Sequence, residues 1–353
     1  MCAGSFVKLF PEVRFLLKRL TEAFGVSGCE TQVRNIIIEE IKNCGADISV
    51  DSMGNLLAFK LAEDNPDAKT IMLSAHMDEV GFIVTDITDE GYLKFASVGG
   101  IDPKILISKR VLVNGNKGVI GLKPIHLTTK EERTHTPKEE DLFVDIGAKT
   151  KEQAQTIAEK GDYFGFDSDY VEFGNQIKAK ALDDRLGCAI MIDVLKQNWN
   201  VNIVCAFTVQ EEVGLRGARV AAKGINPHYA VVIEGTTCND MTGIPPKLRV
   251  TRLGDGAAIS VLDSASKADR EVVEMLISAA KRRNIPWQFK ASTSGGNDAG
   301  AICVTDGGIK TASISVPCRY IHSPVCVMSK DDFESCKKIV KGFLEDCGRD
   351  ERL

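Results

Sequence analysis

Apolar residues recur three or four positions apart in two segments near the start of the chain, a spacing that places them on one face of a helix. The core-facing positions predicted in this way are Val13, Leu16, Leu17 and Leu20 in the first segment, and Val33, Ile37 and Ile41 in the second. Ser27 and Glu30 have the spacing of a capping box, which predicts that the second helix begins there.

From about residue 80 to residue 166 the pattern changes to short β-type runs that glycine and proline interrupt. The predicted strands lie at 80–85, 92–95, 111–113, 119–122 and 142–146. Only residues 151–160 have a helical pattern, and the polar stretch 128–141 is typical of an exposed loop. We therefore predict that residues 79–166 form a small β-rich lid or dimerisation domain, inserted into a catalytic domain that comprises residues 1–78 and 167–353.

Outside this insertion, strands alternate with helices. The predicted strands lie at 56–59, 71–75, 202–208, 230–233 and 311–316, and the predicted helices at 184–196, 215–223, 270–283 and 330–344. Such alternation is typical of an α/β fold with a mixed, largely parallel sheet and helices on both of its faces.

Composition narrows the class of protein. The 353 residues carry a formal net charge of -5, so there is no basic surplus and we expect no nucleic-acid partner. No apolar run is long enough to span a membrane. The eleven cysteines are scattered, odd in number and without a C-x-x-C pair, which favours reduced thiols in a cytoplasmic protein.

Candidate chemistry follows from the residues at strand ends, because open α/β sheets bind ligands beyond the carboxyl ends of their strands. His76, Glu212 and Glu234 each stand at or just after a predicted strand. His322 follows the last strand by a few residues, and Asp183 lies where an extended segment enters a helix. Five potential ligands are thus expected at one rim of the sheet.

Imidazole and carboxylate ligands suit divalent zinc, cobalt or manganese. Two such ions about 3.5–4 Å apart need a bridging carboxylate, for which Asp183 is the candidate. Each ion would then have one histidine and one further carboxylate, from Glu212 or Glu234. A water held between the ions would attack a carbonyl carbon, with Glu211 as the general base that takes its proton. Asp78 could hold the second nitrogen of His76.

Each of these residues also has an ordinary structural interpretation. A single histidine after a strand is often structural, a Glu-Glu pair favours the start of a helix, and Asp183 with Asp184 could simply cap one. From the residues alone both interpretations stay open. His126, His135 and His228 lie in predicted loops without acidic neighbours of this kind, so we leave them out of the site.

Five segments of the sequence resemble peptidase family 42, the glutamyl and deblocking aminopeptidases that include the tetrahedral TET enzymes. In the family's order they are SAHMDEVG (74–81), ALDDR (181–185), QEEVGLRG (210–217), SGGNDA (294–299) and IHSPV (321–325). The resemblance implies a metal-dependent aminopeptidase that acts on short peptides and assembles into a homo-oligomer, from a dimer to a hollow dodecamer. It also implies that His76, Asp183, Glu212, Glu234 and His322 are metal ligands, that Glu211 is the general base, and that the Asp183–Asp184 peptide is cis.

Three positions depart from the family's pattern. Glu234 stands where many members have aspartate, Asn297 replaces a common threonine, and Cys318 lies near the His322 loop. None of these removes a ligand, but the first two put metal preference and side-chain specificity in question.

Three alternatives to an aminopeptidase are weighed. A glycoside hydrolase is one, because some proteins similar to this family are called cellulases, but aromatic residues are only 6% of the chain and such grooves are usually rich in them. A non-catalytic scaffold would have lost a ligand or the base, and none is missing. A carboxypeptidase or deacylase would need a cation for the substrate carboxylate, and Arg319 is the candidate.

Overall fold

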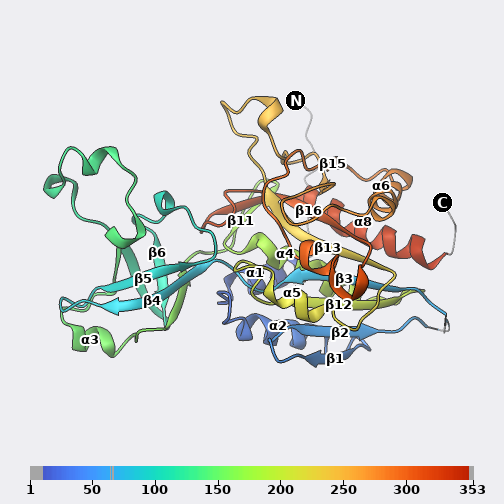
Figure 1. Cartoon of the computed structure of the whole chain (residues 1–353), viewed down its shortest axis with the longest axis horizontal. Coiled ribbons are helices and arrows are strands. Elements are labelled where there is room, and N and C mark those ends of the chain that lie inside the picture. The colour runs from blue at the N-terminus through green and yellow to red at the C-terminus, as the bar shows by residue number, and fades with distance from the viewer. Residues whose placement is uncertain (1–10, 64, 66, 350–353) are drawn as a thin grey trace.

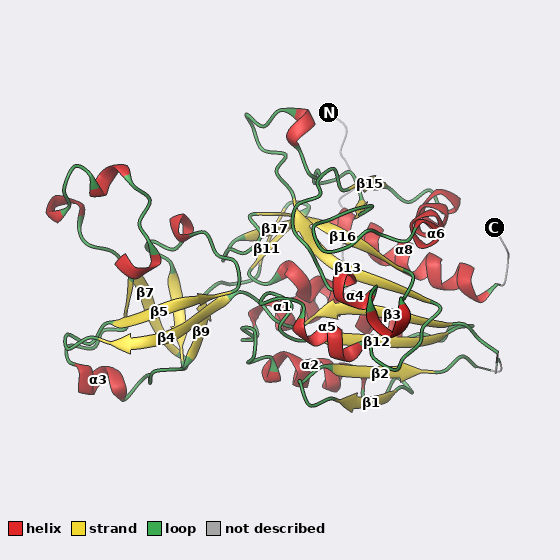
Figure 2. Ribbon diagram, viewed as in Figure 1, coloured by secondary structure: helices red, strands yellow, loops and turns green. Residues whose placement is uncertain are grey.

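Two separate β-structures organise the chain, one large mixed sheet and one small closed barrel (Figure 1). The computed structural model describes residues 11–63, 65 and 67–349. In Figure 2 the barrel lies to one side of the larger part, and the chain passes between them twice. The α/β class and the separate β-rich unit predicted from the sequence are both confirmed.

The large sheet has eleven strands, and its centre is parallel. Nine follow the order β1-β2-β12-β3-β13-β16-β17-β11-β10, while β14 and β15 branch from β16. The strands are β1 (Asp47–Val50), β2 (Leu56–Lys60), β3 (Thr70–His76), β10 (Val171–Phe173), β11 (Gln176–Ala179), β12 (Asn202–Thr208), β13 (Tyr229–Thr237), β14 (Ala257–Ile259), β15 (Trp287–Phe289), β16 (Thr311–Arg319) and β17 (Cys326–Ser329). Strands β12, β3, β13 and β16 pair in parallel, and antiparallel strands extend the sheet on both sides.

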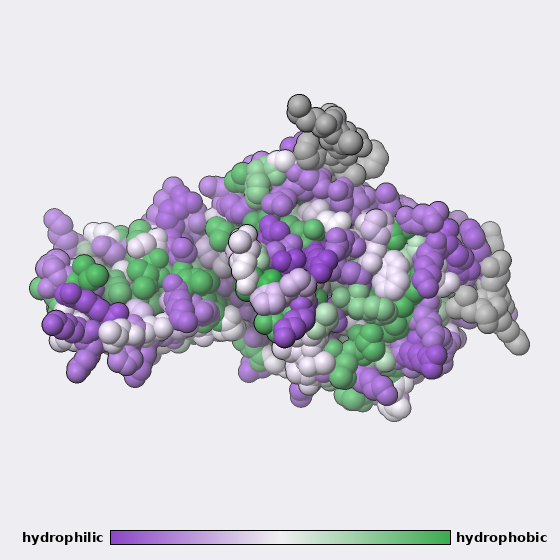
Figure 3. All heavy atoms as spheres, turned by 90° about the horizontal axis from the view of Figure 1, so that it is seen from above, coloured by the Kyte–Doolittle hydropathy of each residue, from purple (hydrophilic) through white to green (hydrophobic). Residues whose placement is uncertain are grey.

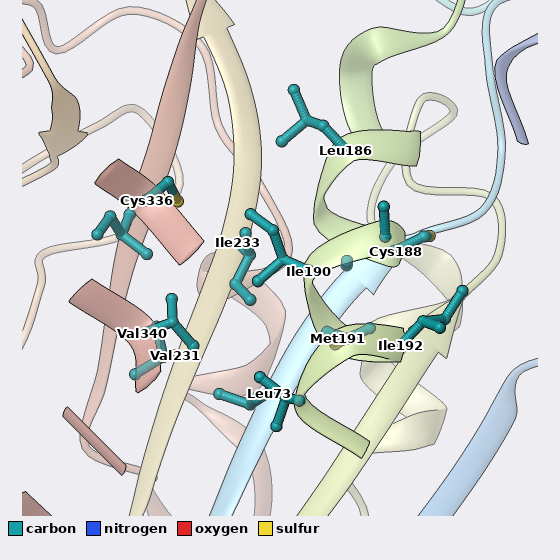
Figure 4. Packing of buried hydrophobic residues seen from close by; sticks show 14 of the residues in the cluster. Leu73, Leu186, Cys188, Ile190, Met191, Ile192, Val231, Ile233, Cys336 and Val340 are labelled. Carbon is teal, nitrogen blue, oxygen red and sulfur yellow. The ribbon is translucent and has the colours of Figure 1, made fainter. Parts of the chain in front are cut away.

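Helices cover both faces of this sheet, as its alternating side chains require. They are α1 (Pro11–Glu22), α2 (Thr31–Ile41), α4 (Leu182–Leu195), α5 (Arg216–Ala221), α6 (Arg270–Arg282), α7 (Ala299–Ile302) and α8 (Lys330–Gly348). Leu73 and Val231 face α4 and α8 in the main core, which Figure 4 shows from close by. Their neighbours Met72 and Val232 point the other way and belong to a second core with α5 and α7.

The small barrel has six antiparallel strands in the closed order β4-β5-β8-β7-β6-β9. They are β4 (Gly81–Ile87), β5 (Leu93–Val98), β6 (Arg110–Val113), β7 (Asn116–Gly121), β8 (Phe143–Asp145) and β9 (Tyr163–Phe166), with the short helix α3 (Lys151–Gln155) beside them. Four phenylalanines, Phe82, Phe95, Phe164 and Phe166, pack together in its interior. The barrel therefore has a hydrophobic core of its own, separate from the cores of the large sheet.

Two local predictions are wrong. Ser27 and Glu30 form no capping box, because the Ser27 hydroxyl donates to Asp78 and Glu30 accepts hydrogen bonds from the backbone N–H groups of Gly28 and Gln210. The helix predicted at 151–160 ends at Gln155. The first difference arises from contacts with distant parts of the chain, Asp78 and Gln210. The second arises because the chain turns after Gln155, which the local spacing does not predict.

The surface is mixed in character. Figure 3 shows apolar and polar residues interspersed over one face of both parts. On the barrel, Ile125 and Leu127 are large apolar residues that are 71% and 60% exposed. Within the part of the chain that the structure describes, no helix is both long and apolar enough to cross a membrane.

A buried cluster of charges links the segment just after β3 to the residues around the start of α4. The Glu79 carboxylate accepts hydrogen bonds from Lys180 Nζ at 2.6 and 2.8 Å and lies 3.4 Å from Arg185 Nη2. Arg185 also donates to the carbonyl of Leu20, and Lys180 to that of Ala23. One carboxylate therefore serves two buried cations, and this connects the segment after β3 to the start of α4.

We predict that Glu79→Gln lowers the free energy of unfolding by about 3–5 kcal/mol, because it leaves two buried cations without their carboxylate. Urea denaturation followed by circular dichroism measures the change. The control is Glu274→Gln, whose partner Arg270 is exposed, and it should leave the unfolding midpoint close to that of the wild type. Equal midpoints for the two variants would contradict this role of Glu79.

Candidate active site

The register of the parallel strands places the candidate ligands His76 and Glu234 side by side in the sheet. His76 pairs with Thr208 across β3 and β12, and Ser74 pairs with Val232 across β3 and β13. Glu234 lies two residues beyond Val232, so it is level with His76 and on the same face of the sheet. The sequence predicted that Glu234 follows the end of its strand. It lies inside β13 instead, because β13 stays paired with β16 as far as Thr237.

Asp183 lies at the centre of the group. It stands at the start of α4, where the Asp183–Asp184 peptide is cis. Its Oδ1 is 3.4 Å from His76 Nε2, and its Oδ2 is 3.7 Å from His322 Nε2. Gly235 permits this position, since a Cβ there would lie 3.0 Å from both Cβ and Oδ1 of Asp183.

The segment after β12 places two adjacent glutamates differently. Backbone N–H groups of Glu211 and Glu212 donate to the Asp78 carboxylate at 2.9 and 3.1 Å, and so fix this turn. Glu212 Oε2 then lies 3.3 Å from His322 Nε2, while Glu211 Oε2 lies 3.9 Å from His76 Nε2. Glu234 Oε2 is 3.6 Å from the same His76 nitrogen.

Asp78 contacts His76 in two ways. Nδ1 of His76 lies 3.1 Å from the Asp78 carbonyl and 3.5 Å from its carboxylate. The carbonyl is the closer partner, and the carboxylate also holds the turn at residues 211–212. Asp78 is therefore positioned to orient both a histidine and the two glutamates.

His322 comes from the loop between β16 and β17 and has a left-handed backbone, with φ of 57°. Its Nδ1 lies 2.8 Å from the carbonyl of Gly100, a residue that follows barrel strand β5. A carbonyl oxygen can only accept a hydrogen bond, so Nδ1 carries the proton and Nε2 faces Asp183 and Glu212 with a free electron pair when the ring is neutral.

Four carboxylates lie close together in this site, those of Asp183, Glu211, Glu212 and Glu234, and their mutual repulsion disfavours the charged forms. Burial raises the pKa of Glu212 to about 7, against the effect of His322. Burial also raises the pKa of Glu211 and of Glu234 well above the ordinary range. Burial alone would lower the pKa of His322, but contact with Asp183 and the charge of Glu212 raise it to about 10. The group therefore holds protons unless other positive charge replaces them.

The residues fit divalent cations. Asp183 Oδ1 and Glu234 Oε1 are buried and have no hydrogen-bond partner among the described residues, a costly state for a carboxylate. Two sets, His76 with Asp183 and Glu212, and His76 with Asp184 and Glu234, each offer ligand atoms within 4.8 Å of one another. A nitrogen and oxygen donor set of this kind can hold zinc, cobalt or manganese.

Asp184 was not among the residues proposed as ligands from the sequence. Its Oδ2 accepts a hydrogen bond from the His76 N–H at 3.2 Å, and its Oδ1 accepts one from the Gly187 N–H at 3.1 Å. Since both oxygens already have backbone partners, we assign Asp184 to holding the strand end and the helix start together.

The five proposed ligands and Glu211 border a cleft of about 440 Å³, which is within the usual size range for ligand sites. Lys290 and Asn297 also line it, and Asn297 Oδ1 accepts the N–H of Ala299. Cys318 instead packs in the main core, and Arg319 is paired with Asp240 at 2.6 and 2.9 Å.

Asp298 was missed as a site residue. It is fully buried, its Oδ2 accepts the Thr208 hydroxyl, and burial raises its pKa to about 6. It lies directly after a Gly-Gly-Asn sequence, but nothing in that spacing indicates that it meets the end of β12.

The sequence is similar to those of proteins named as aminopeptidases. The sequence profile of the M42 glutamyl aminopeptidase family matches residues 54–339. A putative aminopeptidase from Acetivibrio thermocellus is 40% identical over 329 residues, which cover 92% of this chain and 96% of that protein.

Solved structures are similar over nearly the whole chain. The TET1 peptidase of Pyrococcus horikoshii, described as able to assemble into a tetrahedron or a large octahedral shell, has a TM-score of 0.83 at 34% identity, covering 94% of this chain and 99% of that one. A Thermotoga maritima protein named endoglucanase has a TM-score of 0.79 at 36% identity, covering 94% and 97%. The chain therefore belongs to the M42 glutamyl aminopeptidase family.

Proposed function

We propose that this protein is a metal-dependent aminopeptidase that removes N-terminal residues from short peptides. The observation that carries the proposal is that His76 and His322 both face Asp183, while Glu234 lies beside the first histidine and Glu212 beside the second, in the lining of one cleft. Family membership makes peptide hydrolysis the expected reaction.

Two divalent cations, with zinc as our first choice over cobalt or manganese, would share the Asp183 carboxylate. His76 and Glu234 lie 3.6 Å apart on one side of it and would hold the first cation. His322 and Glu212 lie 3.3 Å apart on the other side and would hold the second. Such a pair of ions supplies polarisation of the peptide carbonyl and a water of lowered pKa.

Glu211 is the proposed general base. It lines the cleft beside the proposed ligands, and burial raises the pKa of its carboxyl well above the ordinary range. A carboxylate of raised pKa is a better proton acceptor near neutral pH. Glu211 would take a proton from the attacking water and give it to the leaving amine, while Asp78 holds the backbone of this turn in place.

One acid of the cleft, Glu211, is not a proposed metal ligand and could meet the ammonium group of a substrate. Asp183 and three glutamates line it, whereas Lys290 is the one lining cation apart from the histidines among the described residues. Arg319, which a carboxypeptidase would need for its substrate, is already paired with Asp240. A free N-terminus is therefore the better match for this cleft.

A glycoside hydrolase remains the second candidate because of the similar protein named endoglucanase. Sugar-binding grooves are usually lined by aromatic residues, and none is found among the described residues that line this cleft. The two histidines would also have no task in that reaction. We therefore rank it below peptide hydrolysis.

We further propose a cytoplasmic homo-oligomer. Residues 79–166 would form the inserted dimerisation and lid domain, and residues 1–78 with 167–353 the catalytic domain. The exposed Ile125 and Leu127 support contacts between barrels, because exposed apolar groups often mark interfaces. A similar peptidase assembles into closed shells, which also supports this proposal.

We predict that the zinc-loaded protein releases N-terminal residues from short peptides with free N-termini. Acetylation of the N-terminus should reduce the rate strongly, while amidation of the C-terminus should not, because the cleft selects an ammonium group. Chromatography of the released amino acids measures both effects, with carboxymethyl-cellulose as a control substrate. Release of C-terminal residues, or of sugar alone, would overturn the proposal.

We predict that Glu211→Gln lowers kcat by about 10²- to 10⁴-fold while bound metal stays at the wild-type level, since it removes a base and no ligand. Metal content is measured by plasma mass spectrometry beside the rate of peptide hydrolysis. Glu212→Gln is the matched control, because the neighbouring glutamate is a proposed ligand and its loss should remove metal. Near-normal turnover by Glu211→Gln would show that another group is the base.

A further inference from the structure

We propose that the small barrel is part of the active site, because its residues Gly99 and Gly100 position one of the two cation sites. This inference rests on the proposed function, since it assigns a role to residues around His322. It concerns the segment just after β5, which lies outside the large sheet that supplies the proposed ligands.

The first contact is the hydrogen bond between His322 Nδ1 and the Gly100 carbonyl, 2.8 Å long. It fixes both the tautomer and the orientation of the imidazole, so that Nε2 points at Asp183 and Glu212. A hydrogen bond from the second nitrogen of a ligand histidine typically changes metal affinity by about 10- to 100-fold. In this protein the partner comes from the barrel.

The second contact is steric. Gly99 has a φ of +88°, and a Cβ at this position would lie 2.8 Å from Val80 Cγ1 and 3.3 Å from Glu212 Cβ. Glycine thus allows the barrel backbone to approach Glu212, the proposed partner of His322 at the same cation. Each proposed terminal ligand of this cation therefore lies beside one of these two adjacent barrel residues, His322 beside Gly100 and Glu212 beside Gly99.

The loop that carries His322 is also fastened at the barrel's other connection. The Ser168 hydroxyl donates to the Pro324 carbonyl, and Lys178 Nζ donates to the Ser168 hydroxyl. Tyr320 and His322 both have left-handed backbones, which persist only where surrounding contacts hold them. The two connections between barrel and sheet therefore hold this loop from both sides.

The other cation site has a different support. His76 Nδ1 contacts the carbonyl of Asp78, a residue of its own strand end, and Glu234 lies within the central strand β13. Among the described residues, none of the barrel is hydrogen-bonded to His76 or Glu234. Disturbing the barrel contact should therefore weaken the His322 site and leave the His76 site unchanged.

The test is Gly99→Ala, compared with Gly115→Ala. Both glycines belong to the barrel and have φ of +88° and +80°, but a Cβ at Gly115 meets nothing within 4 Å. Zinc binding to the metal-free full-length proteins is measured by competition with a chromophoric chelator, and His322→Ala identifies the binding step of the His322 site. We expect Gly99→Ala to lose about 10- to 100-fold in affinity at that step only, and Gly115→Ala to bind both ions like the wild type.

A second variant covers the case in which Gly99→Ala does not fold. Ser168→Ala removes a hydroxyl without adding bulk, and it should weaken the same step by a smaller factor while circular dichroism stays unchanged. Wild-type binding by the folded Gly99→Ala protein, or by Ser168→Ala if Gly99→Ala is unfolded, would overturn the inference and leave the proposed function intact. Failure of the wild type to bind a second zinc would instead overturn the proposed function.

Discussion

The repulsion among four carboxylates in one cleft is the constraint on which the rest of the structure depends. Asp183, Glu211, Glu212 and Glu234 are held together where burial raises the pKa of all three glutamates. Buried charges of one sign persist only if protons or cations neutralise them. Two unpaired buried oxygens and two histidines at the same place support the proposal that cations do so here.

The fold supplies the rigidity that this crowding requires. Parallel pairing sets His76 level with Glu234, and the Asp78 carboxylate fixes the turn that bears Glu211 and Glu212. The buried pair of Glu79 and Lys180 then ties the end of β3 to the start of α4, where Asp183 stands. Hydrogen bonds from outside the sheet complete the arrangement at His322, whose loop would otherwise have few constraints.

Sequence patterns predicted the features of the fold and site that depend on residues close together in the sequence. Short apolar runs located β3 and β12, and the polar residue at each carboxyl end followed from the rule for open α/β sheets. The edge strand β10 and its neighbour β11 were missed, because both are short and partly exposed, and β11 pairs with β17 far away in sequence.

The parts of the site that escaped prediction depend on contacts between distant segments. Ser27 donates to Asp78 instead of capping a helix, Asp298 meets Thr208 across 90 residues, and Gly100 reaches His322 across 222 residues. A glycine carbonyl has no signature in the sequence, so only the folded chain reveals its role.

The most direct test of the central claim is the number of cations that the protein binds. Metal-free protein would be loaded with zinc, freed of excess metal by gel filtration and analysed by plasma mass spectrometry, with peptide hydrolysis measured on the same samples. We expect two zinc ions per chain and activity that rises with their occupancy. Full activity in protein that carries no metal would contradict the claim that these carboxylates are gathered to hold two cations.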